Sequence, residues 1–424
     1  MSERHPLVER DRKVAWHPYT QHGADPEPMP VASARGARLT LADGREILDA
    51  VSSWWSILHG HAQPELIAAM ETQARTLDHV MFGGSTHEPA VALAEELLAV
   101  APADLTKVFW SDNGSTAVEI ALKMAYHTHL HAGEGRRTVF VALEGAYHGD
   151  TFGAMAVGDP VPFFEPYAPF LFEVVHVPPT AEAVRAALAE HADRLCAFVA
   201  EPLVQGAAGM VMHDEEVLRA GREGCDAAGA FFIADEVMTG FGRTGSLFAC
   251  DQAGVAPDLL CLAKGLTGGL LPLAVTLATE RIYGSFYSED RTRFFPHGHT
   301  WTAHAIGCAV ARASLRLTLD NDVPARMRSI GERIEANLSE LRDDPRVREL
   351  RRRGGVVALE LHPQRAGGEG YMADLVPGLR RRAIEEGVLL RPLGNVLYAL
   401  PPACTSEAEC DEIARVMTVL VREL

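Results

Sequence analysis

The sequence FFIADEVMTGFGRTG, at residues 231–245, joins an apolar run to two carboxylates and a glycine-rich segment. A short apolar run that ends in polar residues is typical of a strand buried in a sheet. In open α/β sheets, ligands bind beyond the carboxyl ends of the strands, and Asp235 stands at that end. A cap of a turn or helix is the alternative, and this segment alone does not separate the two.

A second apolar run, DLLCLAKG at residues 258–265, ends in Lys264. Lysine is rarely buried unless it is paired or covalently engaged. Schiff-base chemistry needs a lysine whose charge is suppressed, and pyridoxal phosphate needs a carboxylate that keeps its ring nitrogen protonated. Asp235 and Lys264 provide both groups on consecutive strand ends. Together they predict that Lys264 holds pyridoxal phosphate as a Schiff base and that Asp235 binds its ring nitrogen.

The sequence SDNGST, at residues 111–116, provides a candidate phosphate site. We expect a helix to begin near Thr116, which has capping-box spacing to Glu119. Free N–H groups and the positive end of the helix dipole at Gly114 and Ser115 would bind an anion. An ordinary helix cap is the alternative.

Short β-rich runs alternate with helical patterns through the middle of the chain. We expect strands at 138–143, 195–200 and 230–234, and helices at 65–76, 116–127 and 215–228. This alternation is typical of an α/β domain with a mostly parallel sheet.

The two ends of the chain have a different pattern. From about residue 325 we expect a charged helix, a strand at 356–361, a helix near 379–386 and a strand at 396–400. Strands at 38–40 and 46–50, on either side of the Asp43-Gly44 turn, could join these C-terminal elements in space. We therefore expect a large domain over residues 63–317 and a small, discontinuous α+β domain from residues 1–62 and 318–424.

Composition excludes several classes of function. A formal charge of -18 argues against nucleic-acid binding. We expect the basic runs at 351–353 and 380–382 to lie on solvated helical segments, because their surroundings are polar. The N-terminus has no apolar targeting segment, and no apolar run is long enough to span a membrane. The seven cysteines are scattered and lack C-x-x-C spacing, which favours free thiols. We expect a soluble, cytoplasmic protein without a metal site.

These motifs resemble those of the class III aminotransferases of fold type I, and the match covers nearly the whole chain. It includes DEV at 235–237, GFGRTG at 240–245, EGAYHG at 144–149, EP at 201–202 and HGHT at 297–300. The resemblance implies pyridoxal phosphate as cofactor and a large domain with a mostly parallel, seven-stranded sheet.

The same resemblance assigns further residues to the cofactor. It implies that Tyr147 stacks on one face of the cofactor ring, as part of the catalytic machinery, and that Val237 covers the other. Thr300, together with His299, would reach the phosphate in the neighbouring subunit, which implies a homodimer with a shared active site. His299 and the following WTAH at 301–304 depart from the usual family pattern, where proline precedes the threonine.

Three further segments are similar to one subfamily, which acts in biotin biosynthesis. They are WHPYT at 16–20, SWW at 53–55 and LRPLGNV at 390–396. The similarity implies a ping-pong reaction in which pyridoxal phosphate alternates with pyridoxamine phosphate. S-adenosylmethionine would be the amino donor, 8-amino-7-oxononanoate the acceptor and 7,8-diaminononanoate the product.

The implied substrate-binding residues are Tyr19, Trp54, Trp55, Tyr147, Gly298 and Arg391. The tryptophans could line a slot for an aliphatic chain, and Arg391 offers a planar fork to a carboxylate. Without the resemblance, core packing and a structural ion pair would be the preferred interpretations.

Other functions stay open on the sequence alone. Another class III ω-aminotransferase, acting on a diamine or β-amino acid, would share Lys264 and Asp235, and so would an enzyme that takes its amino group from lysine. An aminomutase would turn over one substrate without an external acceptor. Hydrolase, kinase and dehydrogenase motifs are absent from the sequence.

Overall fold

The computed structural model describes residues 5–159, 163–363 and 376–424. Its centre is a seven-stranded sheet in the order β4-β12-β11-β10-β7-β5-β6. These strands are β4 (Leu105–Ser111), β12 (Ala274–Thr279), β11 (Leu259–Leu262), β10 (Phe231–Asp235), β7 (Leu195–Ala200), β5 (Val139–Leu143) and β6 (Val174–Val177). The strand β12 is antiparallel to both of its neighbours, and the other pairs are parallel. The predicted mostly parallel sheet is confirmed.

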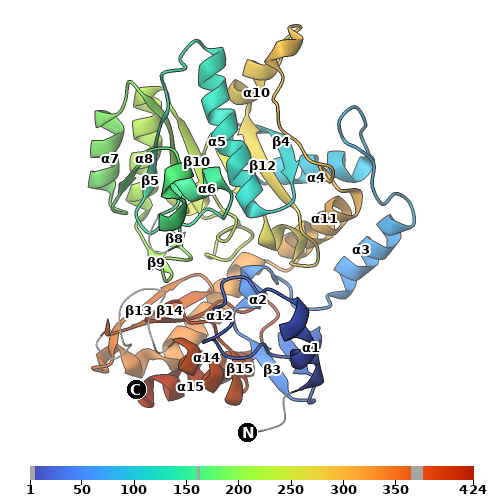
Figure 1. The fold of residues 1–424 in the computed structure, drawn as a ribbon, viewed down its shortest axis with the longest axis vertical. Helices are drawn as coiled ribbons and strands as arrows, with labels where there is room; N and C mark the ends of the chain where they lie inside the picture. Colours follow the sequence, from blue (N-terminus) through green and yellow to red (C-terminus); the bar gives the residue numbers. More distant parts are fainter. Residues whose placement is uncertain (1–4, 160–162, 364–375) are drawn as a thin grey trace.

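Both faces of this sheet are buried. Alternate residues of β10 belong to different apolar clusters: Phe231 and Ile233 pack on one side, and Phe232 and Ala234 on the other. The long helix α5 (Gly114–His131) covers the first face, and α7 (Ala181–Glu190) and α8 (Glu215–Ala228) lie on the other side (Figure 1). Strands covered on both faces are expected to be continuous apolar runs, as the sequence has them.

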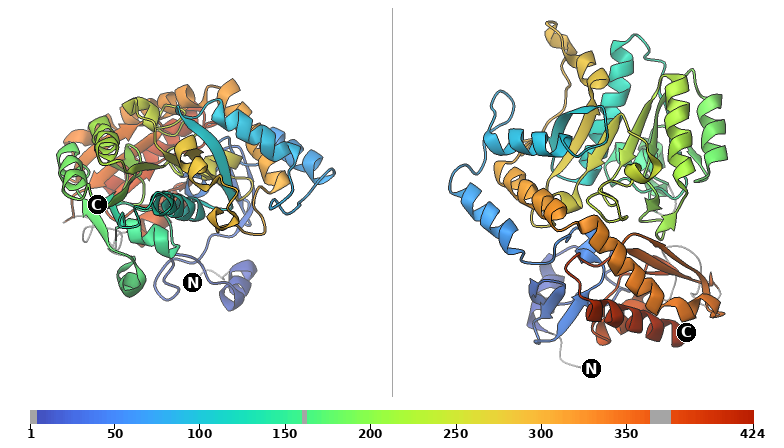
Figure 2. Two further views of the ribbon diagram at one scale, coloured as in Figure 1. Left: turned by 90° about the horizontal axis from the view of Figure 1, so that it is seen from above. Right: turned by 180° about the vertical axis from the view of Figure 1, so that it is seen from behind.

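The two ends of the chain come together below the large sheet. A four-stranded sheet, β1-β2-β3-β15, pairs N-terminal strands with a C-terminal one, and a three-stranded sheet has the order β13-β14-β16. In Figure 1 and in the view from behind in Figure 2, the N-terminal strands in blue lie beside C-terminal elements in orange and red. The strands are β1 (Val31–Arg35), β2 (Arg38–Leu41), β3 (Glu46–Asp49), β13 (Val347–Arg353), β14 (Val356–Leu361), β15 (Val388–Leu389) and β16 (Val396–Ala399).

Helices complete the two parts of the molecule. Those near the small sheets are α1 (Pro6–Val14), α2 (Ser52–Trp55), α12 (Val323–Asn337), α14 (Val376–Glu385) and α15 (Glu407–Arg422). Those near the large sheet include α3 (Pro64–Ala74), α4 (Glu88–Leu98), α6 (Phe152–Val157), α10 (Glu280–Phe286) and α11 (Ala305–Asp320). The division into domains at residues 62 and 317 stays a prediction, and α11 runs across the second of these limits.

One expectation about the basic runs is wrong. Residues 351–353 lie on the strand β13, and Arg351 is no solvated surface residue. Its guanidinium donates to the backbone oxygens of Gly209 and Met210 at 2.6 and 2.9 Å. The run is polar in composition, and yet it forms a strand, because its arginines contact groups from other parts of the chain. Among the described residues, no helix combines the length and apolar character needed to cross a membrane.

Candidate active site

The two residues singled out at strand ends lie together in the structure. Strands β10 and β11 are parallel, and Asp235 is the last residue of β10, opposite Cys261. Lys264 lies two residues after the end of β11 and begins the short helical turn η2 (Lys264–Thr267). Because both strands end at the same edge, the two side chains line one cavity of about 640 Å³.

The Lys264 side chain is held in an environment that suppresses its charge. Its ammonium lies 4.8 Å from the centre of the Trp55 ring. Burial lowers the pKa of Lys264 below its usual value, although the carboxylates of Asp235 and Glu201 oppose the shift. A lysine of this kind has more neutral amine available as a nucleophile and as a base than an exposed one.

The Asp235 carboxylate is fixed on both of its oxygens. Oδ1 accepts from the backbone N–H of Val237 at 3.0 Å, and Oδ2 lies 2.7 Å from Nδ1 of His148. Burial disfavours a charge on His148, but the contact with Asp235 outweighs it and raises the pKa of His148. A carboxylate supported in this way can hold a proton on a ring nitrogen.

The predicted phosphate site has a different cap from the one expected. Helix α5 begins at Gly114, and its capping box joins Asn113 to Thr116, so the expected pairing of Thr116 with Glu119 is wrong. Asn113 Oδ1 accepts from the N–H of Thr116 at 3.1 Å. The Glu119 carboxylate instead accepts from the Thr151 hydroxyl at 2.9 Å, because the turn before α6 passes close to α5.

The start of α5 forms a close-packed cradle. A Cβ at Gly114 would lie 2.5 Å from a methyl carbon of Val237, so the backbone reaches the cavity only because this residue is glycine. The Ser115 hydroxyl accepts from the Thr151 N–H at 3.0 Å. Backbone and hydroxyl donors at the N-terminus of an 18-residue helix suit a phosphate. With Asp235 and Lys264 across the same cavity, the residues present fit pyridoxal phosphate.

A second cavity of about 430 Å³ adjoins the first, and Trp55, Tyr147 and Lys264 line both. The Tyr147 backbone N–H donates to Glu201 at 3.0 Å, and its hydroxyl donates to Asp150 at 3.2 Å. Burial raises the pKa of Glu201 to about 7. These contacts fix Tyr147 at the boundary between the two cavities.

The second cavity combines aromatic walls with two charged groups. The Tyr19 ring meets Trp54 and Phe163 edge-on, with ring centres 5.9 and 5.4 Å apart. The Tyr19 hydroxyl donates to Asp150 at 2.6 Å. The Arg391 guanidinium stacks over the Trp54 ring at 4.0 Å. A negative and a positive group therefore border one apolar slot next to Lys264.

The structure does not bring every predicted residue into these cavities. Gly298, His299 and Thr300 line neither of them. They belong to a loop in which the His297 ring packs against Phe109, and Thr300 is exposed. Their predicted role requires a second copy of the chain, so a single chain leaves it a prediction.

Several polar residues of the site were not singled out from the sequence. Asp150, His148 and Glu201 all line the cavities or contact the residues that do. His148 and Asp150 flank the glycine after Tyr147, and Glu201 follows the buried strand β7 directly. A carboxylate at the end of an apolar run was the signal that identified Asp235, and it was equally present at Glu201.

Comparisons with known proteins agree with this geometry. The aminotransferase class-III family matches residues 19–421. The adenosylmethionine-8-amino-7-oxononanoate aminotransferase of Synechococcus elongatus is 47% identical, over 96% of this chain and 98% of that protein. The one from Nitratidesulfovibrio vulgaris is 41% identical, over 95% of this chain and 79% of that protein.

Solved structures give the same result. The crystal structure of the adenosylmethionine-8-amino-7-oxononanoate aminotransferase of Methanocaldococcus jannaschii has a TM-score of 0.94 and 34% identity, and the match covers 98% of both chains. A PLP-bound amine transaminase from an uncultivated Pseudomonas species has a TM-score of 0.90 and 30% identity, and the match covers 96% of this chain and 98% of that one. By sequence, by fold and by the groups in its cavity, the chain belongs to the class-III aminotransferases.

Proposed function

We propose that this chain transfers an amino group from S-adenosylmethionine to 8-amino-7-oxononanoate, giving 7,8-diaminononanoate for biotin synthesis. The names of its full-length relatives at 47% and 41% identity support this choice of substrates. The observation that carries the proposal is the second cavity, where Asp150 and Arg391 border an aromatic slot that opens on Lys264.

The first cavity holds pyridoxal phosphate in this proposal. Asp235 binds the ring nitrogen, the start of α5 at Gly114 and Ser115 binds the phosphate, and Tyr147 and Val237 contact the ring. When bound, pyridoxal phosphate supplies an aldehyde that reacts with amines and a ring that takes up electrons from the substrate.

Lys264 moves the proton in each half of the reaction. Its Nζ accepts the proton from the donor carbon that carries the nitrogen, and in the second half it returns a proton to C7 of the acceptor. The lowered pKa of Lys264, which burial causes, favours the neutral amine that this base must be. The Trp55 ring lies beside Nζ, with its centre 4.8 Å away.

Each chemical group of the acceptor has a counterpart in the second cavity. It has an ammonium beside its ketone, a long apolar chain and a terminal carboxylate. Asp150, held by the hydroxyls of Tyr19 and Tyr147, provides the negative charge for the ammonium. The rings of Trp54 and Trp55 border the chain, and the Arg391 fork binds the carboxylate. Arg391 also binds the carboxylate of the donor, in the other half of the reaction.

The working enzyme in this proposal is a cytoplasmic homodimer. The loop with Gly298, His299 and Thr300 would complete the site of a second copy, since it lines neither cavity of its own chain. All seven cysteines are free thiols, which suits a reducing compartment.

A second candidate is an aminotransferase for other amines, supported by the fold match to an amine transaminase at 30% identity. Mixing the holoenzyme with S-adenosylmethionine alone and recording the visible spectrum separates the two. The proposal predicts loss of the cofactor's visible band and its return when 8-amino-7-oxononanoate is added. If the band persists with S-adenosylmethionine but disappears with lysine or another amine, the chain is still an aminotransferase, and S-adenosylmethionine as its donor is refuted.

A further inference from the structure

The short helix α2 has an unusual backbone. Ser52, Ser53, Trp54 and Trp55 have φ values of 51, 44, 68 and 73°, so all four lie in the left-handed region. Residues other than glycine enter this region singly, and consecutive ones form a turn that is unfavourable by itself. Such a conformation persists only where the surrounding structure holds it.

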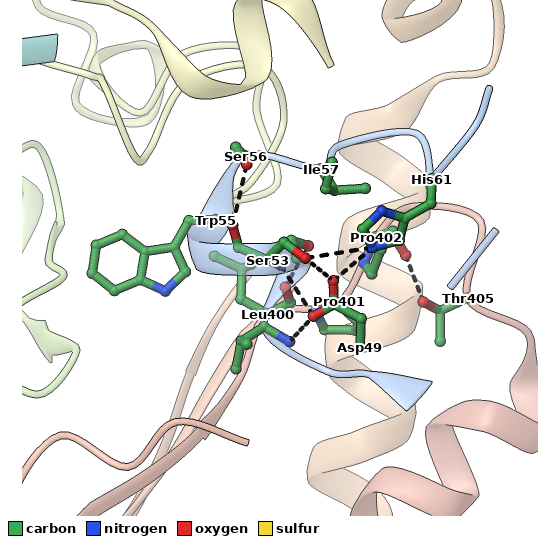
Figure 3. Close-up of polar contacts among 12 residues, drawn as sticks. Asp49, Ser53, Trp55, Ser56, Ile57, His61, Leu400, Pro401, Pro402 and Thr405 are labelled. Carbon is green, nitrogen blue, oxygen red and sulfur yellow. Dashed lines mark hydrogen bonds and ion pairs between the residues drawn. The ribbon is translucent and has the colours of Figure 1, made fainter. Parts of the chain in front are cut away.

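The Asp49 carboxylate holds this turn from one side. It is fully buried, and Oδ1 accepts from the backbone N–H groups of Val51 and Ser53 at 3.2 and 3.0 Å. Oδ2 accepts from the Ser53 hydroxyl at 2.7 Å and lies 2.9 Å from Nε2 of His61. Figure 3 shows this cluster, with the Trp55 ring pointing away from it.

Arg243 holds the other side of the turn. Its guanidinium donates to the Ser52 hydroxyl and the Trp55 carbonyl, each at 3.1 Å. The Ser52 hydroxyl in turn donates to the Leu400 carbonyl at 2.7 Å. The first and last residues of the turn are thereby anchored to other parts of the molecule.

The turn decides where two aromatic walls of the second cavity stand. Trp54 faces Tyr19 and the Arg391 guanidinium, while Trp55 lies beside Lys264 and donates from its ring nitrogen to the Tyr398 hydroxyl at 2.9 Å. The two side chains follow one another in sequence and yet both line the same cavity. A right-handed turn would send them in other directions.

We propose that Asp49 is a positioning residue for the aliphatic chain of the acceptor and acts through the left-handed turn. It touches neither cavity itself. The inference rests on the proposed function for the identity of the acceptor, whereas the dependence of Trp54 and Trp55 on Asp49 holds for any occupant of the slot.

Three variants of Asp49 test this inference. Asp49→Ala removes every contact, and we expect it to raise KM for 8-amino-7-oxononanoate about tenfold while kcat changes less than about threefold. Asp49→Asn keeps an oxygen for the two backbone N–H groups, so its KM should stay near that of the wild type. Asp49→Ser, with a smaller polar group, replaces Asp49→Ala if that variant does not fold, and the same KM rise is expected of it.

A readout that needs no substrate is the emission spectrum of tryptophan. Two of the chain's five tryptophans lie on the turn, so Asp49→Ala should shift the emission while Asp49→Asn should not. The matched control is Asp258→Asn, a buried carboxylate that binds the Phe232 N–H and Arg222 away from both cavities. It should lower the melting temperature without changing KM or the emission.

Glycine at the turn provides a rescue. In Asp49→Ala/Ser53→Gly the backbone enters the left-handed region without a Cβ, and KM should return most of the way to the wild-type value. Equal KM values in the wild type and Asp49→Ala, with unchanged emission, would overturn the inference. Equal rises in KM for Asp49→Asn and Asp49→Ala would also overturn it, because the effect would then come from the lost contact with His61 and not from the turn. Failure of the proposed function looks different, because the wild type itself would not turn over 8-amino-7-oxononanoate.

Discussion

The cavity around Lys264 takes its chemical groups from the ends of neighbouring strands, whereas the cavity around Trp54 takes them from segments as far apart as Tyr19 and Arg391. In the first, Asp235 and Lys264 lie close because parallel strands end at one edge of a sheet. In the second, the N-terminal segment, the left-handed turn and a loop after β15 meet through contacts between residues far apart in the sequence.

This difference predicts different consequences of mutation. In the proposed function the groups at strand ends act on the cofactor, so that removing one should stop turnover of every substrate. Groups that line the second cavity and not the first, such as Tyr19 and Arg391, should contact only parts of the substrate, so that their loss should appear in KM and depend on which substrate is used.

The largest effect is expected for Lys264→Ala. In the proposed mechanism the variant loses the amine that engages the cofactor and moves the proton, so kcat should fall on the order of 10³- to 10⁴-fold for every donor. Its visible absorbance with pyridoxal phosphate should differ from that of the wild type, because no covalent link forms. Lys13→Ala, in the exposed part of α1, is the control and should behave as the wild type. Retention of the wild-type band in Lys264→Ala would refute the assignment.

An intermediate effect is expected for Arg391→Ala. A charged hydrogen bond and a stacking contact with Trp54 are lost, so KM for 8-amino-7-oxononanoate should rise about ten- to a hundredfold. An acceptor without the terminal carboxylate should be affected far less. Arg415→Ala, which removes a surface pair with Glu386, is the matched control. An equal loss for both acceptors would contradict a carboxylate-binding role.

The smallest effect is expected for Tyr19→Phe. The ring still packs against Trp54 and Phe163, and only the hydroxyl that donates to Asp150 is lost. Steady-state kinetics should show KM for the acceptor rising about two- to tenfold with little change in kcat. Tyr167→Phe, on an exposed tyrosine, should leave both constants unchanged. If kcat falls as much in Tyr19→Phe as in Lys264→Ala, the two cavities do not act separately.

The sequence predicted local elements better than contacts between distant ones. The strand 195–200 and the helix 215–228 agree with β7 and α8 to the residue, because apolar periodicity and capping residues are local signals. The cap of α5 was wrong because Asn113, one turn earlier, competes as the capping residue. The strand containing Arg351 was missed because the sequence did not show the partners of this arginine, which pairs with Glu349 and Glu360 and donates to backbone oxygens more than 100 residues away.

The sequence alone was enough to place Asp235 and Lys264 beside one cavity, because both follow consecutive apolar runs and parallel strands end at one edge. Only the tertiary structure decided the geometry of the substrate slot. The backbone of Ser52–Trp55 is unfavourable locally, and contacts from Asp49, Arg243 and Leu400 hold it. This conformation opposes local preference and could not be derived from the local sequence, because two of the groups that stabilise it, Arg243 and Leu400, lie 191 and 348 residues from Ser52.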